Sequence, residues 1–403
     1  MKETAVSLGP PRLQHAHQWR DFALYVHIPY CTTKCPYCDF NSYPVEQWPE
    51  EEYVQALVQE LRSYAEVPPF EGGRLRSIFF GGGTPSLFQA RSLARVIDEA
   101  ARLWPLRHDA EITVETNPGT VDKRKLMNLR NVGINRISFG AQSFQPHLLA
   151  ILGRTHTVDD SRNSVWHASS VGFDNINVDL MYAIPGQSPE EAKSDAKIAA
   201  SLPVTHVSAY ALTYARGTLY YKWLNRGWLA PIHEAIEDEM TVVLRDVLGE
   251  AGFEQYEVSN FAKPGFASRH NLTYWRAEPY LGVGAGAHGF AYPGGEHGFG
   301  WRWANEEAPN RYMARVKRHG HARETLEHLT ITESREEYFL LTLRCREGLS
   351  KAEYRARYGR NPEEDFPDML LLWKEGRLST DGEFWRIPES DVFVTDAIIS
   401  RIL

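Results

Sequence analysis

Three of the four cysteines in this chain fall within one short stretch, at Cys31, Cys35 and Cys38, in the spacing C-x₃-C-x₂-C. Cysteine thiolates are soft ligands, and a cluster of them in a reducing compartment indicates zinc or iron–sulfur chemistry. A closed zinc site takes four ligands and most iron–sulfur clusters take four cysteines, but here the run continues with Asp39 and Phe40. Three thiolates on a 4Fe–4S cube leave one iron open for another molecule. A zinc knuckle with a distant histidine as fourth ligand, or reduced thiols without metal, are the alternatives.

Other groups that could bind a ligand stand where buried strands are expected to end. The glycines of Gly81-Gly82-Gly83-Thr84 would let the backbone lie close to a ligand. Carboxylates can accept hydrogen bonds from ribose hydroxyls or an ammonium group, and arginine can pair with a carboxylate. The candidates are Gly82, Gly83 and Thr84 of the glycine turn, and the polar residues Glu115, Gln142, Arg154 and Asp179 at predicted strand ends or just beyond. The structural alternatives are a tight turn for the glycines and ordinary salt bridges for the charged residues.

Two histidines and one tyrosine outside the cysteine run are further candidates. His270 stands near Tyr274 and Trp275, and a histidine beside aromatic residues can ligate haem iron while the aromatic rings stack on the macrocycle. His288 follows a glycine-rich stretch, and Tyr25 lies on the strand before the cysteines. A hydrogen-bonded structural histidine, and a tyrosine that fills the core, are the alternatives.

The elements that must position these residues follow an alternating pattern. Apolar strands are predicted at residues 23–28, 77–80, 111–115, 136–140, 175–180 and 206–210, and helices at 53–64, 92–103, 123–131, 159–171 and 189–202. Strands that alternate with helices at about thirty residues per unit form right-handed βαβ units around a parallel sheet. Six units predict an α/β fold with a partial, open (β/α)6 barrel of the TIM type. Sites in such barrels gather at the C-terminal ends of the strands, where the cysteines, Glu115, Gln142 and Asp179 all fall.

The pattern changes after the sixth strand, and we expect four segments. Residues 1–21 form a loose arm, 22–230 the barrel, 231–328 an extension that carries His270, and 329–403 a C-terminal α+β module that resembles a winged helix. Within these segments we expect helices at 234–250, 333–344, 351–358, 365–374 and 391–402, a strand at 256–261 and a hairpin around Asp381-Gly382.

Composition and charge exclude several functions. The chain has 403 residues, 43% of them hydrophobic, and a net charge of −8, so it has no basic footprint for nucleic acid. The C-terminal module is acidic as well, with 11 Lys and Arg against 15 Asp and Glu, which does not suit a phosphate backbone. No run approaches the ~20 apolar residues of a membrane span, and four cysteines with three in one motif argue against a disulfide framework. We expect a soluble, cytoplasmic protein.

Taken together, the motifs resemble the HemN/HemW family of the radical S-adenosylmethionine (SAM) superfamily. The resemblance extends over residues 22–403 and rests on the run from Tyr25 to Tyr43, Gly81-Gly82-Gly83-Thr84-Pro85-Ser86, Glu115-Thr116-Asn117-Pro118-Gly119, Gly140-Ala141-Gln142-Ser143-Phe144, Leu152-Gly153-Arg154, Asp179-Leu180-Met181 and Ile184-Pro185-Gly186. It implies that Cys31, Cys35 and Cys38 ligate a 4Fe–4S cluster, whose open iron chelates SAM. It also implies that Tyr25, Gly82, Gly83, Thr84, Glu115, Gln142, Arg154 and Asp179 bind the cofactor and that His270 contacts haem.

The family has two functional classes. The oxygen-independent coproporphyrinogen III oxidases carry a further cysteine two residues after the third cluster cysteine, where this chain has Phe40, and they have a longer N-terminal arm. The HemW-type haem chaperones have Asp-Phe at this place and an H-N-x-x-Y-W motif, which His270, Asn271, Tyr274 and Trp275 match. Both features favour the chaperone class. A radical enzyme with another substrate is a third alternative, and the residues leave open whether the chain is an enzyme that cleaves SAM.

The chaperone class implies a set of partners. They are haem, client haem proteins such as respiratory-chain components, and an electron donor for the cluster. No nucleic acid and no membrane span are expected, while peripheral contact with a membrane stays open.

Overall fold

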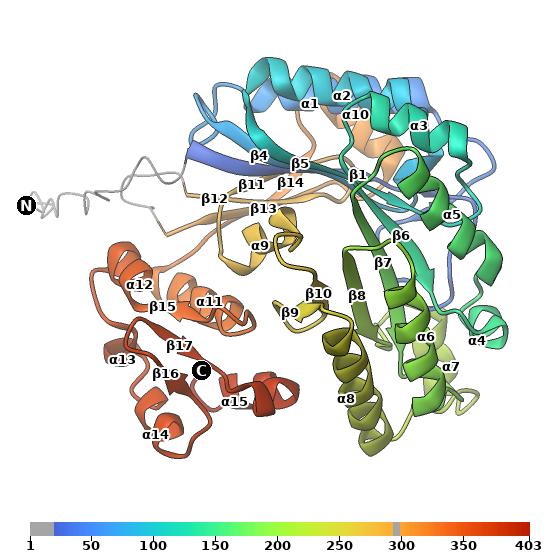
Figure 1. The fold of residues 1–403 in the computed structure, drawn as a ribbon. Coiled ribbons are helices and arrows are strands. Elements are labelled where there is room, and N and C mark those ends of the chain that lie inside the picture. The colour runs from blue at the N-terminus through green and yellow to red at the C-terminus, as the bar shows by residue number, and fades with distance from the viewer. Residues whose placement is uncertain (1–19, 293–298) are drawn as a thin grey trace, which may run out of the picture.

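The computed structural model describes residues 20–292 and 299–403, which form a large α/β part and a smaller C-terminal module (Figure 1). The predicted arm at residues 1–21 lies outside the described residues except for its last two, of which Asp21 begins the first strand.

Six parallel strands form the centre of the large part, in the order of the sequence. They are β1 (Asp21–Ile28), β4 (Arg74–Gly82), β5 (Leu106–Thr116), β6 (Arg136–Gln142), β7 (Asn175–Tyr182) and β8 (His206–Ala211). Each predicted strand lies within one of these six, and each neighbouring pair is parallel. On the other sides of the outer strands, β1 pairs with β11 (Tyr280–Val283) and β8 pairs with β10 (Asn260–Ala262). The six strands therefore form the open barrel that the alternation predicted.

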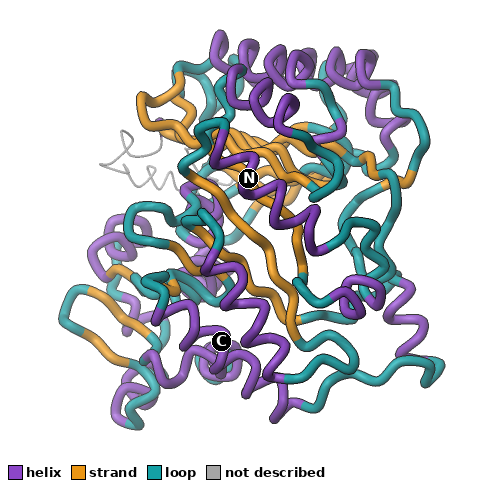
Figure 2. The backbone as a smooth tube through the Cα atoms, turned by 45° about the vertical axis from the view of Figure 1, so that its right-hand side comes forward, coloured by secondary structure: helices purple, strands orange, loops and turns teal. Residues whose placement is uncertain are grey.

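Helices connect these strands and cover the outer face of the sheet, as Figure 2 shows. They are α1 (Glu50–Tyr64), α2 (Ala90–Leu103), α3 (Lys123–Asn131), α4 (Pro146–Ile151), α5 (Val158–Ser170) and α6 (Pro189–Ser201). Capping boxes at Thr157 and Ser188 begin α5 and α6. Each hydroxyl accepts a hydrogen bond from the amide of the third helical residue, and the carboxylate of that residue accepts one from the amide of the capping residue. Buried residues such as Leu57, Val96 and Val165 pack on the strands to form the main core.

The sheet continues on both sides of the barrel to a total of twelve strands. Beyond β1 lie β11 (Tyr280–Val283), β12 (His288–Ala291), β13 (Trp301–Asn305) and β14 (Arg323–His328), and beyond β8 lie β10 (Asn260–Ala262) and β9 (Glu254–Gln255). The predicted strand at 256–261 is wrong in extent, because residues 256–259 connect β9 to β10 and only Asn260 and Phe261 lie in a strand. The strands β11 and β12 were not predicted, since their glycines weaken the apolar pattern. Gly289 is required there, because a Cβ would lie 2.1 Å from the Trp303 ring.

Four helices accompany this extension. They are α7 (Leu219–Asn225), α8 (Glu234–Glu250), α9 (Arg269–Trp275) and α10 (Pro309–His319). Helix α8 has the predicted bounds. No helix in the described chain has the length and apolar character needed to cross a membrane.

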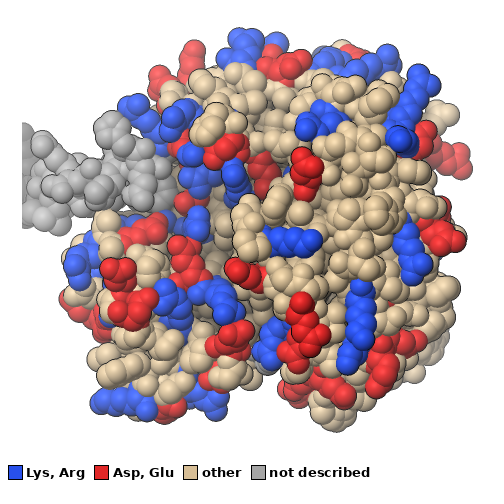
Figure 3. Space-filling view, in the orientation of Figure 1, with Lys and Arg blue, Asp and Glu red and all other residues tan. Residues whose placement is uncertain are grey.

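The C-terminal module has its own core and a three-stranded sheet. Its elements are α11 (Ile331–Thr342), β15 (Leu349–Ser350), α12 (Lys351–Tyr358), α13 (Pro362–Asp365), α14 (Met369–Lys374), β16 (Ser379–Thr380), β17 (Phe384–Arg386) and α15 (Thr395–Ile399). The hairpin at Asp381-Gly382 joins β16 to β17 as predicted. The predicted last helix is shorter, because Glu389–Val394 form a 3₁₀ turn before α15. On the face shown in Figure 3, acidic and basic side chains are interspersed over this module and the sheet part.

Candidate functional site

The clustered cysteines lie on a loop that leaves the end of β1. A short parallel pair, β2 (Tyr30–Cys31) and β3 (Tyr43–Pro44), closes the base of the loop. The amide of Tyr43 donates to the carbonyl of Pro29 at 2.7 Å, and the amide of Val45 donates to that of Cys31 at 2.9 Å. The loop is therefore anchored at both ends to the rim where the barrel strands end.

Each of the three sulfur atoms has a polar neighbour that suits a thiolate. Thr84 Oγ1 donates to Cys31 Sγ at 3.5 Å, and Arg154 Nη1 donates to Cys35 Sγ at 3.5 Å. The hydroxyl of Ser42 lies 3.8 Å from Cys38 Sγ. Burial raises the pKa of the Cys31 and Cys38 thiols, so a bound metal is the feature that would hold them as thiolates.

The donor set fits a 4Fe–4S cube. Within residues 20–292 and 299–403, no three Cys, His, Asp or Glu side chains are arranged to hold one metal ion together. That finding concerns a mononuclear centre, whereas each thiolate of a cube binds a different iron, so the ligands of a cube stand further apart. Three cysteines on one anchored loop, each with a polar group at its sulfur, meet the needs of a cube with one open iron.

The glycine turn at the end of β4 lies directly against the cysteine loop. The amide of Gly83 donates to the carbonyl of Ile28, and the amide of Thr84 donates to that of Tyr30, both at 2.8 Å. A Cβ on Gly83 would lie 2.6 Å from the carbonyl oxygen of Tyr30, and Gly82 has a φ of +114°. The glycines are thus required for the turn itself, and the turn brings the Thr84 hydroxyl to Cys31.

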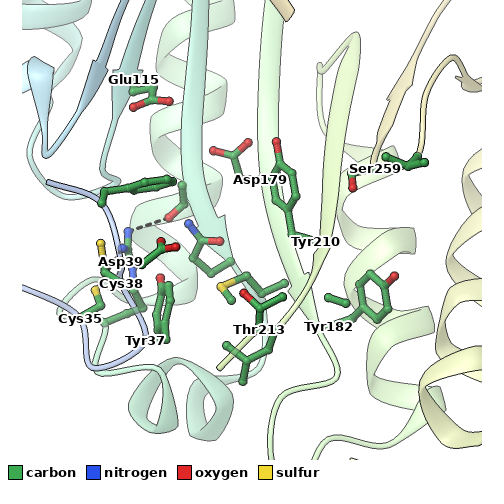
Figure 4. Close-up of a pocket in the computed structure, with 18 of the residues that line it drawn as sticks. Cys35, Tyr37, Cys38, Asp39, Glu115, Asp179, Tyr182, Tyr210, Thr213 and Ser259 are labelled. Atoms are coloured by element: carbon green, nitrogen blue, oxygen red, sulfur yellow. Dashed lines mark hydrogen bonds between the residues drawn. The ribbon is translucent and has the colours of Figure 1, made fainter. Parts of the chain in front are cut away.

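Two carboxyl groups face each other beside this turn. In Figure 4, Glu115 at the end of β5 and Asp179 on β7 point into the same part of the pocket. Glu115 Oε2 accepts a hydrogen bond from the amide of Gly82 at 3.1 Å, and Asp179 accepts from Asn177 at 2.6 Å and from Ser138 at 3.2 Å. Burial, with the nearby Asp179, raises the pKa of Glu115 to about 8, and burial also raises the pKa of Asp179. A cation or a hydroxyl-bearing ligand placed between the two groups would stabilise their ionised forms.

Two further predicted residues carry signs of strain or of unused bonding capacity. Gln142, at the end of β6, has a φ of +67°, a conformation that residues other than glycine seldom adopt and that clusters at ligand sites. Arg154 Nη2 donates to Asn117 Oδ1 at 2.7 Å and to the carbonyl of Gly140 at 2.8 Å. Its buried Nε has no hydrogen-bond partner among the described residues, so it could still donate to an anionic group of a ligand.

Ten of the twelve predicted site residues line one pocket of about 820 Å³. They are Cys31, Cys35, Cys38, Gly82, Gly83, Thr84, Glu115, Gln142, Arg154 and Asp179. The pocket also has walls that the sequence analysis did not single out. They are Tyr182 and Tyr210 from the strand ends, acidic residues of α8, and, from the C-terminal module, Arg344, Val392 and residues 394–397. Tyr210 could have been found by its place at the end of a predicted strand. The module's contribution depends on tertiary packing and leaves no local signal.

Tyr25 and His270 lie apart from this set. Tyr25 lines a neighbouring pocket, and its hydroxyl lies 2.9 Å from His27 Nδ1. His270 is 1% exposed, its Nδ1 lies 2.9 Å from the Ser77 hydroxyl and its Nε2 lies 2.8 Å from the Tyr274 hydroxyl. Iron ligation through either nitrogen would require one of these hydrogen bonds to break. As a haem contact His270 stays a prediction.

Comparison with known proteins agrees with this geometry. Residues 25–199 match the Radical SAM superfamily, and residues 329–394 match the HemN C-terminal domain. The solved structure of coproporphyrinogen III oxidase (HemN) from Escherichia coli, described as a radical SAM enzyme, aligns over 96% of this chain and 92% of that chain with a TM-score of 0.79. At 22% sequence identity this likeness shows a shared fold.

Two relatives are more similar in sequence. The heme chaperone HemW of Escherichia coli (strain K12) is 35% identical over 94% of this chain and 98% of its own length. The heme chaperone HemW of Bacillus subtilis (strain 168) is 37% identical over 89% of this chain and 93% of its own length.

The fold and the site define a radical SAM protein with the HemN architecture. Within that class, the chain belongs to the HemW heme chaperone family. A 4Fe–4S cluster and SAM are the cofactors of this superfamily. When bound, the cluster supplies an electron and one open iron for the sulfonium cofactor. Three cysteine sulfurs, the carboxyl groups of Glu115 and Asp179 and the Arg154 guanidinium surround one cavity, where they could bind these two cofactors.

Proposed function

We propose that this protein is a haem chaperone, which binds haem together with a 4Fe–4S cluster and SAM and delivers the haem to haem proteins. The observation that carries the proposal is the identity of 35% to 37% with proteins named heme chaperone HemW over nearly the whole chain. The two alignments cover 94% and 89% of the chain.

The residue that follows the cluster cysteines also supports this choice. An oxygen-independent coproporphyrinogen III oxidase is expected to have a further cysteine two residues after Cys38, and this chain has Phe40 there. The Phe40 side chain is 62% exposed and lines the pocket that the cluster cysteines line. An apolar ring therefore occupies the place where the oxidase class presents a thiol. The oxidase remains the second candidate because of the shared HemN fold.

The residues that line the pocket support an assignment of the cofactor positions. We assign Cys31, Cys35 and Cys38 to the cluster, and the amino group of SAM to the glycine turn. The remaining contacts to SAM are assigned to Thr84, Glu115, Gln142, Arg154 and Asp179. Tyr25 lines the neighbouring pocket, and its contact to SAM stays a prediction. The unpartnered Arg154 Nε and the facing carboxyl groups of Glu115 and Asp179 support this assignment.

The finer features of the proposal concern where and with whom the protein acts. The clients are haem proteins such as respiratory-chain components, a separate protein reduces the cluster, and the setting is the cytoplasm with peripheral contact at a membrane. The four segments at 1–21, 22–230, 231–328 and 329–403 are proposed as the units of the chain. The match of residues 329–394 to the HemN C-terminal domain supports the last of them.

Haem titration and an oxidase assay on the same anaerobic, cluster-replete sample test the proposal. A haem chaperone should bind haem stoichiometrically, show a Soret band that survives gel filtration, and leave coproporphyrinogen III unconverted in the presence of SAM and a reductant. Loss of the Soret band on gel filtration, with conversion to protoporphyrinogen, would establish the oxidase instead.

A further inference from the structure

A second pocket, of about 720 Å³, adjoins the first one at the rim of the sheet. The two pockets share a wall, which consists of Lys34 and of Asp39, Phe40 and Ser42 at the end of the cysteine loop. The other side of the second pocket is formed by β1, α9 and the turn between β11 and β12. A ligand in this pocket would therefore lie next to the cluster loop but outside the cavity assigned to SAM.

The second pocket is rich in aromatic side chains. Tyr25, Tyr274, Tyr280 and Phe40 all line it. The rings of Tyr274 and Tyr280 meet edge to face, with centroids 4.6 Å apart, and the Tyr274 hydroxyl is held by His270 Nε2 at 2.8 Å. A flat aromatic ligand would find fixed apolar surfaces here without a rearrangement of the core.

Three histidines lie at or behind this pocket, and they differ in what their rings can still bind. His27 has Nε2 at 2.8 Å from the carbonyl of Asn41 and Nδ1 at 2.9 Å from the Tyr25 hydroxyl. His270 has both nitrogens bonded in the same way. His288, at the start of β12, lines the pocket and is exposed. The described part of the chain gives its ring no hydrogen bond or ion pair. Of the three, His288 is the one whose imidazole is ready to accept a metal.

The backbone that carries His288 is anchored to the cysteine loop. Asn41 Nδ2 donates to the carbonyl of Ala285 at 3.0 Å and to that of Glu307 at 2.9 Å. A Cβ on Gly286 would lie 2.4 Å from Asn41 Nδ2, so only glycine allows this close approach. The turn before His288 is thus fixed in position, while His288 itself is exposed and lines the pocket.

We propose that the second pocket is the haem seat and that His288 is the axial ligand to the iron, an inference that rests on the proposed haem-chaperone function. His270 then acts as a positioning residue, which holds Tyr274 in the pocket wall from behind. Asp39 and Glu307 also line the pocket, and their carboxylates would repel anionic groups. The haem propionates would therefore point to solvent or to the ammonium group of Lys34. An exposed ligand suits a carrier, because a client can reach the iron and take the haem.

The test uses full-length, cluster-replete protein titrated with haemin, with three variants. His288→Ala should abolish the imidazole–iron signature in the electron paramagnetic resonance and Soret spectra and increase haem transfer to apomyoglobin at least tenfold. Added free imidazole should restore the signature. His270→Ala should keep the signature while haem release becomes faster. His167→Ala, which removes an exposed histidine on the outer helix α5, should behave as wild type.

Each other outcome contradicts the inference in a recognisable way. If His288→Ala keeps the imidazole signature and His270→Ala loses it, His270 is the ligand and the assignment is wrong. If both variants keep the signature, the ligand lies elsewhere. If the wild-type protein retains no haem after gel filtration, the proposed function fails and the seat fails with it. Iron and sulfide content and the melting temperature, measured for each variant, show that the fold and the cluster are intact.

Discussion

The guanidinium group of Arg154 donates a hydrogen bond to Cys35 Sγ at 3.5 Å, across the rim from the cysteine loop to the segment after α4. The same guanidinium bonds Asn117 and the carbonyl of Gly140 through its other terminal nitrogen. Arg154 therefore joins the proposed cluster ligand to the strand ends that form the proposed SAM cavity. A positive charge and a donor at a cluster sulfur favour the reduced, more negative state of the cluster.

Replacement of Arg154 should therefore change the reduction potential of the cluster. In Arg154→Gln the positive charge is lost, and the midpoint potential should fall by on the order of 50 mV, since 59 mV corresponds to a tenfold change for a one-electron couple. Arg154→Lys keeps the positive charge, so its midpoint potential should fall less than that of Arg154→Gln. The lysine cannot make all three hydrogen bonds of the guanidinium at once. Anaerobic spectroelectrochemistry measures both. Equal potentials in wild type and Arg154→Gln would show that Arg154 does not act on the cluster.

The identity of the cluster ligands can be tested with an internal control. A 4Fe–4S cube contains about four iron and four sulfide ions. Each of the substitutions Cys31→Ser, Cys35→Ser and Cys38→Ser should reduce both contents well below this value. Cys345 is buried in the C-terminal part, where burial raises the pKa of its thiol to about 12, and Cys345→Ser should keep the full cluster. Iron and sulfide analysis after anaerobic reconstitution is the measurement. Zinc in the wild-type protein, in place of iron and sulfide, would support the zinc alternative.

The raised pKa of Glu115 predicts a pH dependence of stability. Because burial and Asp179 raise this pKa to about 8 from 4.5, the folded protein binds the proton more tightly than the unfolded chain does. The corresponding stability is fully present below the unfolded pKa and is lost as the pH rises through about 8. Glu115→Gln stays neutral and still offers an oxygen to the Gly82 amide, so it should lose less stability than wild type from about pH 5 to about pH 9.

The expected difference is on the order of 1–3 kcal/mol at the alkaline end, since one pKa unit corresponds to about 1.4 kcal/mol. Thermal unfolding of SAM-free protein across this pH range measures it. Glu234→Gln, which removes an exposed carboxylate at the edge of the same pocket, should follow the wild-type curve. Parallel curves for wild type and Glu115→Gln would mean that Glu115 is ionised in the folded protein at neutral pH.

Much of the fold could be predicted because its determinants are local. The six barrel strands are short apolar runs, and the helices between them have apolar faces. The hydrophobic periodicity and the glycines that end the elements therefore predicted where the strands and helices lie. The rule that parallel strands end at one edge then placed Glu115, Gln142 and Asp179 near the cysteines. The structure brings these residues to one pocket.

The features that sequence reasoning missed depend on distant parts of the chain. The strands β11 and β12 contain glycines because other backbone or ring atoms lie against them, and this is visible only in the folded state. Val392 and residues 394–397 close the pocket, although most of the chain length separates them from the cysteine loop. The hydrogen bonding of the His270 ring also depends on tertiary structure, since its partner Ser77 is 193 residues away in the sequence.

The contact of the glycine turn with the cysteine loop gives a last test, with a matched control. In Gly83→Ala a Cβ would lie 2.6 Å from the Tyr30 carbonyl oxygen, a backbone atom that cannot move aside. The variant should be destabilised by roughly 1–3 kcal/mol, as overpacked sites are, and should lose cluster occupancy because Thr84 is displaced from Cys31. Gly249→Ala, in α8 with no atom within 4 Å of the new Cβ, should be neutral or stabilised by up to about 1 kcal/mol. Denaturant unfolding and iron content measure both variants. Full cluster content and unchanged stability in Gly83→Ala would show that the turn can move away from the loop without loss of the site.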